Sequence, residues 1–289
     1  AGKLPARRRS HSGASAGHLL ENHSFVREVA IVQETMRIAV AGATGRVGRH
    51  VVDVLKEQGH DVVPMSRSYG VDVATGAGLA DALAGVDGII DCSTGPSPEQ
   101  AAATEFFTTA AKNLHEFGAR ARVPRLVVVS IIGTDKFVGG YGAAKLAHEH
   151  AASAGPIPSR VLRAAQFHEF VGQLVDWGTQ GDVAYVARMR TQVVAARAVA
   201  EALVALAIDP AFTPDSPGEP VAEIAGPREE NLVDLARLLM AHRGDARRIE
   251  GASDPGNPDD ALNESGALLP GPHATLAGPT FAEWLEASD

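Results

Sequence analysis

The residue pair best suited to chemistry is Tyr141 and Lys145, in the segment Tyr-Gly-Ala-Ala-Lys. This spacing puts both side chains on one face of the helix that we expect over residues 141–152. An ammonium group beside a phenol favours the phenolate, so the pattern predicts that Lys145 lowers the pKa of Tyr141. A tyrosine tuned in this way can pass a proton to or from a substrate oxygen. The simpler alternative is that Tyr141 only begins the helix.

Ser130 is the third candidate for a catalytic role. It ends an apolar run over residues 125–130, which is typical of a strand buried on both faces of a parallel sheet. Ligands of such sheets bind beyond the carboxyl ends of the strands. We therefore expect the Ser130 hydroxyl to hold the substrate oxygen on which Tyr141 acts.

Three glycines, Gly42, Gly45 and Gly48, recur at every third position between a predicted strand and a predicted helix. In a dinucleotide-binding turn the first glycine allows the tight turn, the second lets the backbone approach the pyrophosphate, and the third lets the helix pack closely. The helix N-terminus adds free N–H groups and a partial positive charge for the phosphates. The position of the motif favours a dinucleotide site over an ordinary glycine-rich turn.

The residues after the second predicted strand indicate which dinucleotide would bind. Ser66, Arg67 and Ser68 stand where proteins that bind NAD carry an acidic residue for the ribose hydroxyls. The guanidinium of Arg67 can instead form paired hydrogen bonds with the 2′-phosphate, and both serines can donate to it. NADP(H) is therefore expected in preference to NAD(H), unless Arg67 is only a solvated loop residue. Asp72 either contacts the adenine region or ends a turn.

Other polar residues lie near the same predicted elements. Ser93 follows a predicted strand and is expected near the cofactor, whereas Cys92 beside it is expected to be a small buried residue without a nucleophilic role. His168 is either a general acid or a structural histidine. His148 and His150 point to different sides of one helix, so no metal site is predicted.

Short apolar runs alternate with helical patterns from Met36 onward, which indicates βαβ units. The expected fold class is α/β, a Rossmann-type doubly wound parallel sheet with a small C-terminal substrate lobe. Strands are expected over residues 36–41, 61–65, 70–73, 86–91, 125–130 and 160–163. Helices are expected over residues 47–58, 79–84, 98–121, 141–152, 195–208 and 230–242. Residues 210–220 and 251–272 are expected to be irregular.

Composition narrows the possible partners and domains. The net charge of −9 argues against a nucleic-acid partner. A single cysteine excludes an intrachain disulfide, and no apolar run reaches membrane-spanning length, so we expect a cytoplasmic protein without a membrane partner. Residues 1–35 are expected to be a disordered tail or extension, and residues 36–289 an NAD(P)-binding domain whose substrate-binding part spans about 165–289.

Taken together, the glycine turn, the strand-ending serine and the Tyr-x-x-x-Lys pair resemble the short-chain dehydrogenase/reductase superfamily. The Gly-Ala-Thr-Gly form of the turn, with an arginine after the second strand, is similar to the atypical NmrA-like branch of NAD(P)-binding proteins. The resemblance covers roughly residues 36–285 and implies a catalytic set of Ser130, Tyr141 and Lys145. It also implies cofactor contacts at Gly42, Thr44, Gly45, Arg46, Val47, Gly48, Arg67, Ser93 and Lys145.

Two departures from that pattern keep three functions open. The serine-to-tyrosine spacing is a little short for the classical enzymes of the superfamily. The NmrA-like branch also includes members that bind dinucleotide without turnover and often lack the tyrosine. The favoured hypothesis is an NADP(H)-dependent reductase of a small carbonyl or enone-like substrate. The alternatives are a regulatory protein that senses NADP(H), and an epimerase or dehydratase that recycles its cofactor. The helix over residues 98–121 could support a homodimer.

Overall fold

A seven-stranded parallel sheet forms the centre of the computed structural model, which describes residues 34–254 and 256–287. The strands lie in the order β12-β9-β5-β4-β3-β1-β2, and every neighbouring pair is parallel. Their bounds are β1 (Arg37–Ala41), β2 (Asp61–Met65), β3 (Gly88–Asp91), β4 (Leu126–Ile131), β5 (Ser159–Ala164), β9 (Ala222–Ala225) and β12 (Thr275–Leu276). The α/β, Rossmann-type prediction is confirmed. The proposed tail lies almost wholly outside the described residues.

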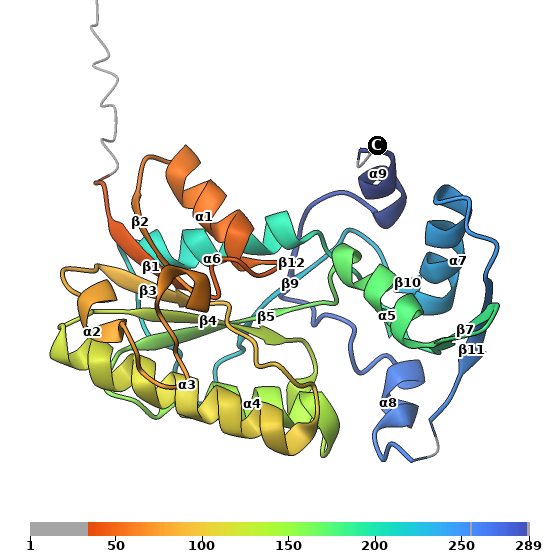
Figure 1. Cartoon of the computed structure of the whole chain (residues 1–289), viewed down its shortest axis with the longest axis horizontal. Helices are drawn as coiled ribbons and strands as arrows, with labels where there is room; N and C mark the ends of the chain where they lie inside the picture. The colour runs from red at the N-terminus through yellow and green to blue at the C-terminus, as the bar shows by residue number, and fades with distance from the viewer. Residues whose placement is uncertain (1–33, 255, 288–289) are drawn as a thin grey trace, which may run out of the picture. The chain divides into compact units, whose positions relative to one another are not determined.

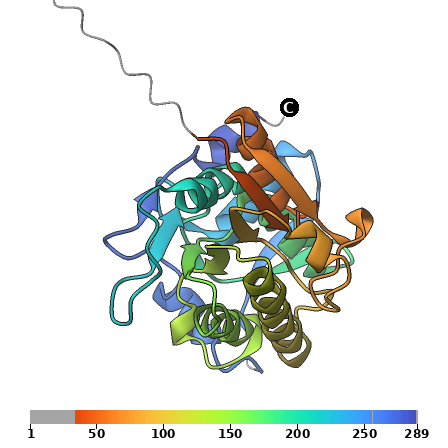
Figure 2. The ribbon, with the colours of Figure 1, turned by 90° about the vertical axis from the view of Figure 1, so that its left-hand side faces the viewer.

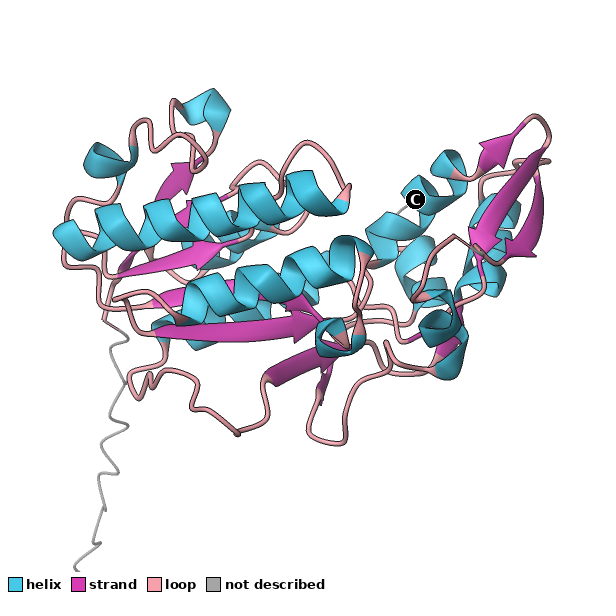
Figure 3. Cartoon of the chain, turned by 90° about the horizontal axis from the view of Figure 1, so that it is seen from below, coloured by secondary structure: helices cyan, strands magenta, loops and turns pink. Residues whose placement is uncertain are grey.

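Helices cover both faces of this sheet, as Figure 1 shows and Figure 2 repeats from the side. One face carries α1 (Gly48–Glu57) and α6 (Ala196–Ile208). The other carries α2 (Leu79–Ala82), α3 (Gln100–Arg120) and α4 (Gly140–Ser153), and α3 and α4 run side by side (Figure 3).

The central strands are apolar on both faces because both faces are covered. In β4, Leu126 and Val128 belong to the core under α3 and α4, while Val127 belongs to the core under α1 and α6. Side chains alternate along a strand, so Ser130 at its end faces the α3 and α4 side. The apolar run over residues 125–130 therefore predicted this strand correctly.

The expected strand over residues 70–73 is absent, and β2 forms the edge of the sheet. The Asp72 side chain accepts hydrogen bonds from the backbone N–H groups of Ala74 and Thr75, which folds the segment into a turn. Pro64 in β2 has no N–H to offer an outer neighbour, and proline is tolerated in a strand at such an edge. Of the two roles considered for Asp72, the structure shows the turn.

A smaller lobe follows the carboxyl ends of the strands and has its own apolar core. It is built from three separate stretches of chain, because α6 and β9 return to the sheet after the first stretch and β12 returns to it after the second. The main elements of this lobe are α5 (Val171–Trp177), β6 (Thr179–Gln180), β7 (Val183–Ala187), β8 (Arg190–Thr191), β10 (Glu230–Asn231), α7 (Leu232–His242), β11 (Arg248–Ala252), α8 (Asp260–Ser265) and α9 (Phe281–Glu286). A small lobe in the C-terminal part of the chain is therefore present, although α6, β9 and β12, which fall within the predicted range of about 165–289, belong to the sheet and its covering helices.

Two details of the lobe differ from the expectation. Residues 251–272, expected to be irregular, contain the end of β11 and the helix α8, and residues 230–231 form β10 before α7 begins. Strand β11 pairs in parallel with β7, which lies more than sixty residues earlier and so gives no local signal. Within residues 34–254 and 256–287, no helix is long and apolar enough to cross a bilayer.

Candidate active site

The glycine turn between β1 and α1 is packed too closely to accept side chains at two positions. Gly42 has a left-handed backbone with φ of 73°, and a Cβ atom there would lie 2.6 Å from the Cys92 carbonyl oxygen. A Cβ atom on Gly48 would lie 2.1 Å from the Gly42 carbonyl oxygen. The N–H groups of Gly42 and Ala43 donate to the Met65 carbonyl, which ties the turn to β2. The glycines therefore have the roles that the sequence predicted for Gly42 and Gly48.

The N-terminus of α1 is open to an anion. Val47 occupies the N-cap position and provides no side-chain cap, and Thr44 and Gly45 in front of it are exposed. Uncapped N–H groups and the helix dipole together favour a phosphate at such an end. Apart from its chain neighbours, only the Gly42 carbonyl oxygen lies within 4 Å of a Cβ placed on Gly45, so there is room above this residue. The turn therefore fits the pyrophosphate of a dinucleotide.

Arg46, in the same turn, points to the lobe. Its guanidinium donates a 2.7 Å hydrogen bond to the Gln173 side chain and lies 5.4 Å from the centre of the Phe170 ring. Both partners belong to the segment that begins the lobe, at α5. Arg46 thus joins the expected phosphate site to the lobe.

Arg67 begins a single 3-10 turn, η1 (Arg67–Tyr69), directly after β2. Its side chain is exposed and makes no hydrogen bond or ion pair with any described residue. Beside it, the Ser66 and Ser68 hydroxyls lie 2.8 Å apart and hydrogen-bond to each other. An unpaired guanidinium at this strand end is free to bind a phosphate.

Two buried serines stand at the carboxyl ends of central strands, Ser93 after β3 and Ser130 within β4, and the Ser130 hydroxyl has no hydrogen-bond partner among the described residues. Ser93 is 5% exposed and Ser130 is 2% exposed. A buried hydroxyl without a partner costs free energy, so such atoms call for a ligand group. Both serines were predicted to be near a ligand. The unsatisfied Ser130 hydroxyl fits that role, whereas the Ser93 side chain has the Asp91 carboxylate beside it.

Lys145 is buried on α4 and points to the sheet. Its Nζ atom donates a 2.7 Å hydrogen bond to the Val129 carbonyl, next to Ser130, and lies 2.9 Å from His148 Nδ1. The ammonium also stands 4.4 Å from the centre of the Phe107 ring on α3. Burial lowers the pKa of Lys145 to about 8, although the Asp91 carboxylate opposes this shift.

Tyr141 stands at the start of α4, half-buried, with its ring edge-on to the Phe107 ring at 5.8 Å. Burial raises the pKa of Tyr141, which is the reverse of the shift that the spacing to Lys145 predicted. The reason is that the Lys145 ammonium is turned to Val129 and His148. No hydrogen bond joins Tyr141, Ser130 and Lys145 to one another in the part of the chain that the structure describes.

Tyr141 lines a cavity of about 230 Å³ between the sheet and the lobe. The walls include Phe137 from the loop before α4, Gln166 after β5, and Met189 and Asn263 from the lobe. Asp259 of the lobe holds the loop in place, since its carboxylate accepts hydrogen bonds from the backbone N–H groups at positions 138 and 139. The cavity is therefore bounded by both parts of the fold.

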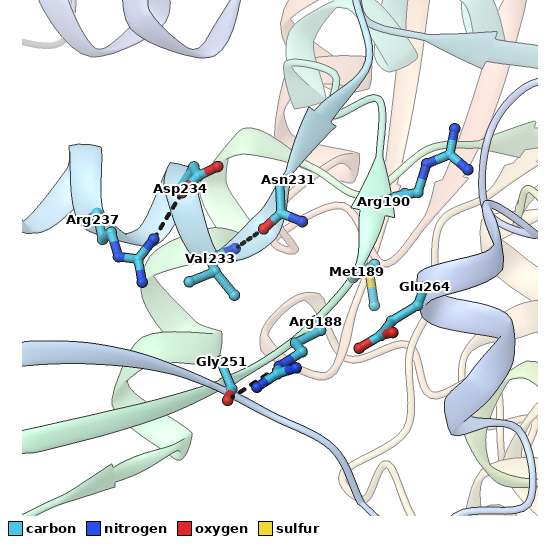
Figure 4. Close-up of a pocket in the computed structure, with 9 residues that line it drawn as sticks. All are labelled: Arg188, Met189, Arg190, Asn231, Val233, Asp234, Arg237, Gly251 and Glu264. Atoms are coloured by element: carbon cyan, nitrogen blue, oxygen red, sulfur yellow. Dashed lines mark hydrogen bonds and ion pairs between the residues drawn. The ribbon is translucent and has the colours of Figure 1, made fainter.

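A second, larger cavity of about 570 Å³ lies in the lobe and shares Met189 with the first (Figure 4). Three arginines line it. Arg190 pairs with Glu229 and Arg237 with Asp234, whereas Arg188 has no acidic partner among the described residues and donates only a long 3.4 Å bond to the Gly251 carbonyl. The side chains of Asn231 and Glu264 complete the polar lining.

Two residues that sequence reasoning did not place in the site are Asp91 and His148. His148 Nε2 lies 3.1 Å from Asp91 Oδ2, and the other ring nitrogen contacts Lys145. His148 follows Lys145 by three positions, so its place on the same helix face was a usable signal. Its contact with Asp91 spans 57 positions and had no local signal.

The remaining candidates have structural roles. His168 is buried against Phe281 and Trp284 of α9, and its Nε2 atom hydrogen-bonds to the Pro279 carbonyl, so it is not in the cavity beside Tyr141. Cys92 is buried, and burial raises the pKa of its thiol, which keeps it protonated. Within the described residues, no three His, Cys, Asp or Glu side chains are grouped to hold a metal ion.

Comparison with known proteins gives one family match. The sequence matches the family described as NAD(P)H-binding over residues 42–210. No curated protein matches the chain.

Solved structures with a similar fold are distant in sequence. A short-chain dehydrogenase/reductase superfamily protein from Agrobacterium tumefaciens with bound NAD is 17% identical, with a TM-score of 0.59 over 87% of this chain and 95% of that one. A UDP-N-acetylglucosamine 4-epimerase from Bacillus cereus is 16% identical, with a TM-score of 0.60 over 88% and 95%. A dTDP-4-dehydrorhamnose reductase from Clostridium acetobutylicum is 16% identical, with a TM-score of 0.61 over 86% and 92%. These likenesses establish the fold.

Proposed function

The chain belongs to the NAD(P)H-binding family, and from this premise we propose that it is an NADP(H)-dependent reductase of a small carbonyl or enone-like substrate. The observation that carries the proposal is a juxtaposition at the carboxyl edge of the sheet. The open glycine turn follows β1, and the buried hydroxyl of Ser130 lies in β4, with only β3 between the two strands. The ammonium of Lys145 and the cavity beside Tyr141 belong to α4, which packs on this part of the sheet.

The choice of NADP(H) rests on Arg67. Its exposed guanidinium has no partner among the described residues, and it follows β2, where the adenosine ribose of a dinucleotide lies in this class of sheet. A free guanidinium can form paired, charge-assisted hydrogen bonds with a 2′-phosphate. NADH has no such group, so it would gain nothing from Arg67.

The protonation state of Tyr141 favours reduction. Because its pKa is raised by burial, the phenol keeps its proton at neutral pH. It can then donate that proton to a substrate oxygen that is gaining negative charge. The cofactor, when bound, supplies the hydride to the substrate carbon. The unsatisfied Ser130 hydroxyl can donate a hydrogen bond to the same oxygen, which would hold the substrate for this transfer.

The second cavity suggests a feature of the substrate. Arg188 lines it without an acidic partner in the described chain, and Met189 connects it to the cavity beside Tyr141. A substrate that places its carbonyl group near Tyr141 could therefore place a carboxylate or another acidic group near Arg188. We include acidic carbonyl compounds among the substrates to be tested.

A second candidate function is NADP(H) sensing without turnover. One observation favours it, namely that Tyr141 makes no hydrogen bond to Ser130 or Lys145 among the described residues. Apo geometry often loosens catalytic contacts, so this observation does not outweigh the raised pKa and the adjoining cavity. Epimerases such as the one from Bacillus cereus share the fold, but an unpaired Arg67 suits NADP(H), which exchanges freely, better than a retained NAD.

The test has two steps. Thermal unfolding with NADPH, with NADH and without nucleotide should show a rise in Tm with NADPH of several degrees, since a ligand at 100 times its Kd adds about 2.7 kcal/mol. NADPH consumption is then followed with neutral and acidic aldehydes, ketones and enones. NADPH binding without consumption of any substrate would favour the sensor. A Tm rise with NADH alone would refute the role of Arg67, and no rise with either nucleotide would refute the proposed function.

A further inference from the structure

A buried chain of polar side chains connects α4 to the end of β3. Lys145 Nζ lies 2.9 Å from His148 Nδ1, and His148 Nε2 lies 3.1 Å from Asp91 Oδ2. The other carboxylate oxygen, Asp91 Oδ1, accepts a 2.9 Å hydrogen bond from the Ser93 backbone N–H. The chain therefore runs from the ammonium to a carboxylate that is itself held by the loop after β3.

The contacts define which nitrogen of His148 carries the proton. An ammonium can only donate, so His148 Nδ1 must accept from Lys145, and the ring proton lies on Nε2. That N–H then donates to Asp91. The ring is further fixed by the Phe107 ring, which stacks on it at 4.7 Å and an interplanar angle of 18°. Neutral His148 thus bridges one positive and one negative charge.

Burying these charged and polar side chains costs free energy of folding, so the arrangement points to a role beyond stability. His148 is 0% exposed, Asp91 1% and Lys145 4%. Replacing a buried ion pair by apolar residues of similar volume is often neutral or stabilising. Folding alone therefore does not require the chain of charges, whereas a ligand that needs the ammonium would.

We propose that Asp91 and His148 are positioning residues that hold the Lys145 ammonium against the end of β4 for the cofactor ribose. The proposal rests on the proposed function. An ammonium has three N–H donors, and Lys145 donates two of them to the Val129 carbonyl and to His148. The third has no acceptor among the described residues and is the donor left for the hydroxyls of a bound ribose.

The same pair keeps Lys145 charged. Around the ammonium, β3 and the residue after it contribute Asp91 and Cys92, α4 contributes His148 and Glu149, and α3 contributes only the Phe107 ring. Burial lowers the pKa of Lys145, and the Asp91 carboxylate is the charge that opposes this shift most strongly. Loss of the Asp91 charge should therefore leave Lys145 neutral over more of the physiological pH range.

The pKa of Lys145 can be followed without any cofactor. The chain has five lysines, so NMR of protein with labelled lysine side chains can resolve the Lys145 signal, assigned with Lys145→Met. In the native protein we expect a midpoint of about 8. In Asp91→Asn, which keeps the size of the side chain but can accept only one of the two hydrogen bonds that Asp91 accepts, the midpoint should fall by about one unit. This is at the low end for a lost opposite charge, because His148 separates the two groups. His148→Leu should also lower it.

His115→Gln is the matched control. His115 is a second buried histidine, between α3 and α4, but it hydrogen-bonds only to backbone atoms at positions 152 and 157. This variant should lose stability without moving the Lys145 midpoint. If Asp91 and His148 had only a structural role, the Lys145 midpoint would be unchanged in Asp91→Asn, in His148→Leu and in His115→Gln. That result would overturn the proposal.

NADPH affinity measured against pH supplies the link to the cofactor. Binding should weaken as pH rises through the Lys145 midpoint, and in Asp91→Asn the weakening should begin at lower pH. Unchanged NADPH affinity in Asp91→Asn at every pH, despite a shifted midpoint, would overturn the role in holding the ribose. If the native protein does not bind NADPH, the proposed function fails, while the Lys145 titration still shows whether the pair fixes the charge of the ammonium.

Discussion

Replacement of Gly45 by alanine separates folding from cofactor binding. The new methyl group would lie 3.1 Å from the Gly42 carbonyl oxygen and would meet nothing else within 4 Å apart from its chain neighbours. Gly45 does not have a positive φ, so alanine fits the backbone. The free energy of unfolding should then change by no more than about 1 kcal/mol. For a chain of this length that corresponds to roughly 2–4 °C in Tm.

The affinity for NADPH should change far more than the stability, because the methyl group fills the space through which a pyrophosphate would approach. Losing one hydrogen bond between the turn and a charged phosphate costs about 1.5–3 kcal/mol, or roughly a 10–150-fold loss of affinity. At a concentration that is 100 times the native Kd, NADPH should stabilise the native protein by about 2.7 kcal/mol, or roughly 5–11 °C. After a loss of about 100-fold, the same concentration gives only about 0.4 kcal/mol, or roughly 1–2 °C.

The assay is thermal unfolding of both proteins with and without NADPH, and Gly48→Ala is the comparison. Its methyl group would lie 2.1 Å from the Gly42 carbonyl oxygen, so this variant should lose about 1–3 kcal/mol of stability even without nucleotide. A Gly45→Ala protein that keeps both its native Tm and its full NADPH response would show that no pyrophosphate passes over this residue. The reasoning about the turn would then be wrong.

Three further predictions follow from single side chains. Arg67→Ala should weaken NADPH binding roughly 10–100-fold and leave NADH binding unchanged, as measured by calorimetry, because only NADPH carries the phosphate. Tyr141→Phe should retain NADPH binding while turnover falls by about 10²–10⁴-fold, the usual contribution of a positioned acid, in steady-state assays. Burial lowers the pKa of His115 below its ordinary value of 6.5. Below pH 6.5 the unfolded chain therefore binds a proton that the folded chain does not bind, so Tm should fall as the pH falls below 6.5, and it should fall less steeply in His115→Gln.

Each of these has an outcome that would contradict it. Arg120, an exposed arginine paired with Glu116 on α3, is the control for Arg67, and equal losses of NADPH and NADH affinity in Arg67→Ala would exclude a phosphate contact. Full turnover in Tyr141→Phe would mean that another group donates the proton. A Tm that depends on pH identically in native protein and His115→Gln would show that the pKa of His115 is the same in the folded and the unfolded chain.

Local patterns predicted the first half of the fold well. The glycine turn, the buried run of β4 and the helix α4 each carry their signal within a few residues, and each lies close to its expected position. The lobe was harder to predict because β7 pairs with the distant β11. One local signal was available there, since Thr280 and Glu283 form a capping box that begins α9.

The candidate site could also be predicted only in part from the sequence. The residue types in the turn and in Tyr141, Lys145 and Ser130 were apparent from spacing, and the structure places all of them near the carboxyl edge of one sheet. Their contacts were not apparent. Lys145 points to His148 and the strand, away from a hydrogen bond with Tyr141, because Asp91 reaches His148 from a strand far earlier in the sequence. Such pairings depend on tertiary packing, which spacing along one helix does not report.

The interleaving of sheet and lobe bears on how the chain folds during synthesis. After β5 the chain enters the lobe, returns through α6 and β9, enters the lobe again, returns through β12 and enters the lobe a third time with α9. While residues up to 164 alone have left the ribosome, the sheet lacks α6, and the apolar face that this helix covers stays exposed. The last parallel pairing, β12 with β9, closes only when nearly the whole chain is available. We therefore expect slow late folding steps and chaperone contact at the α6 face of the sheet.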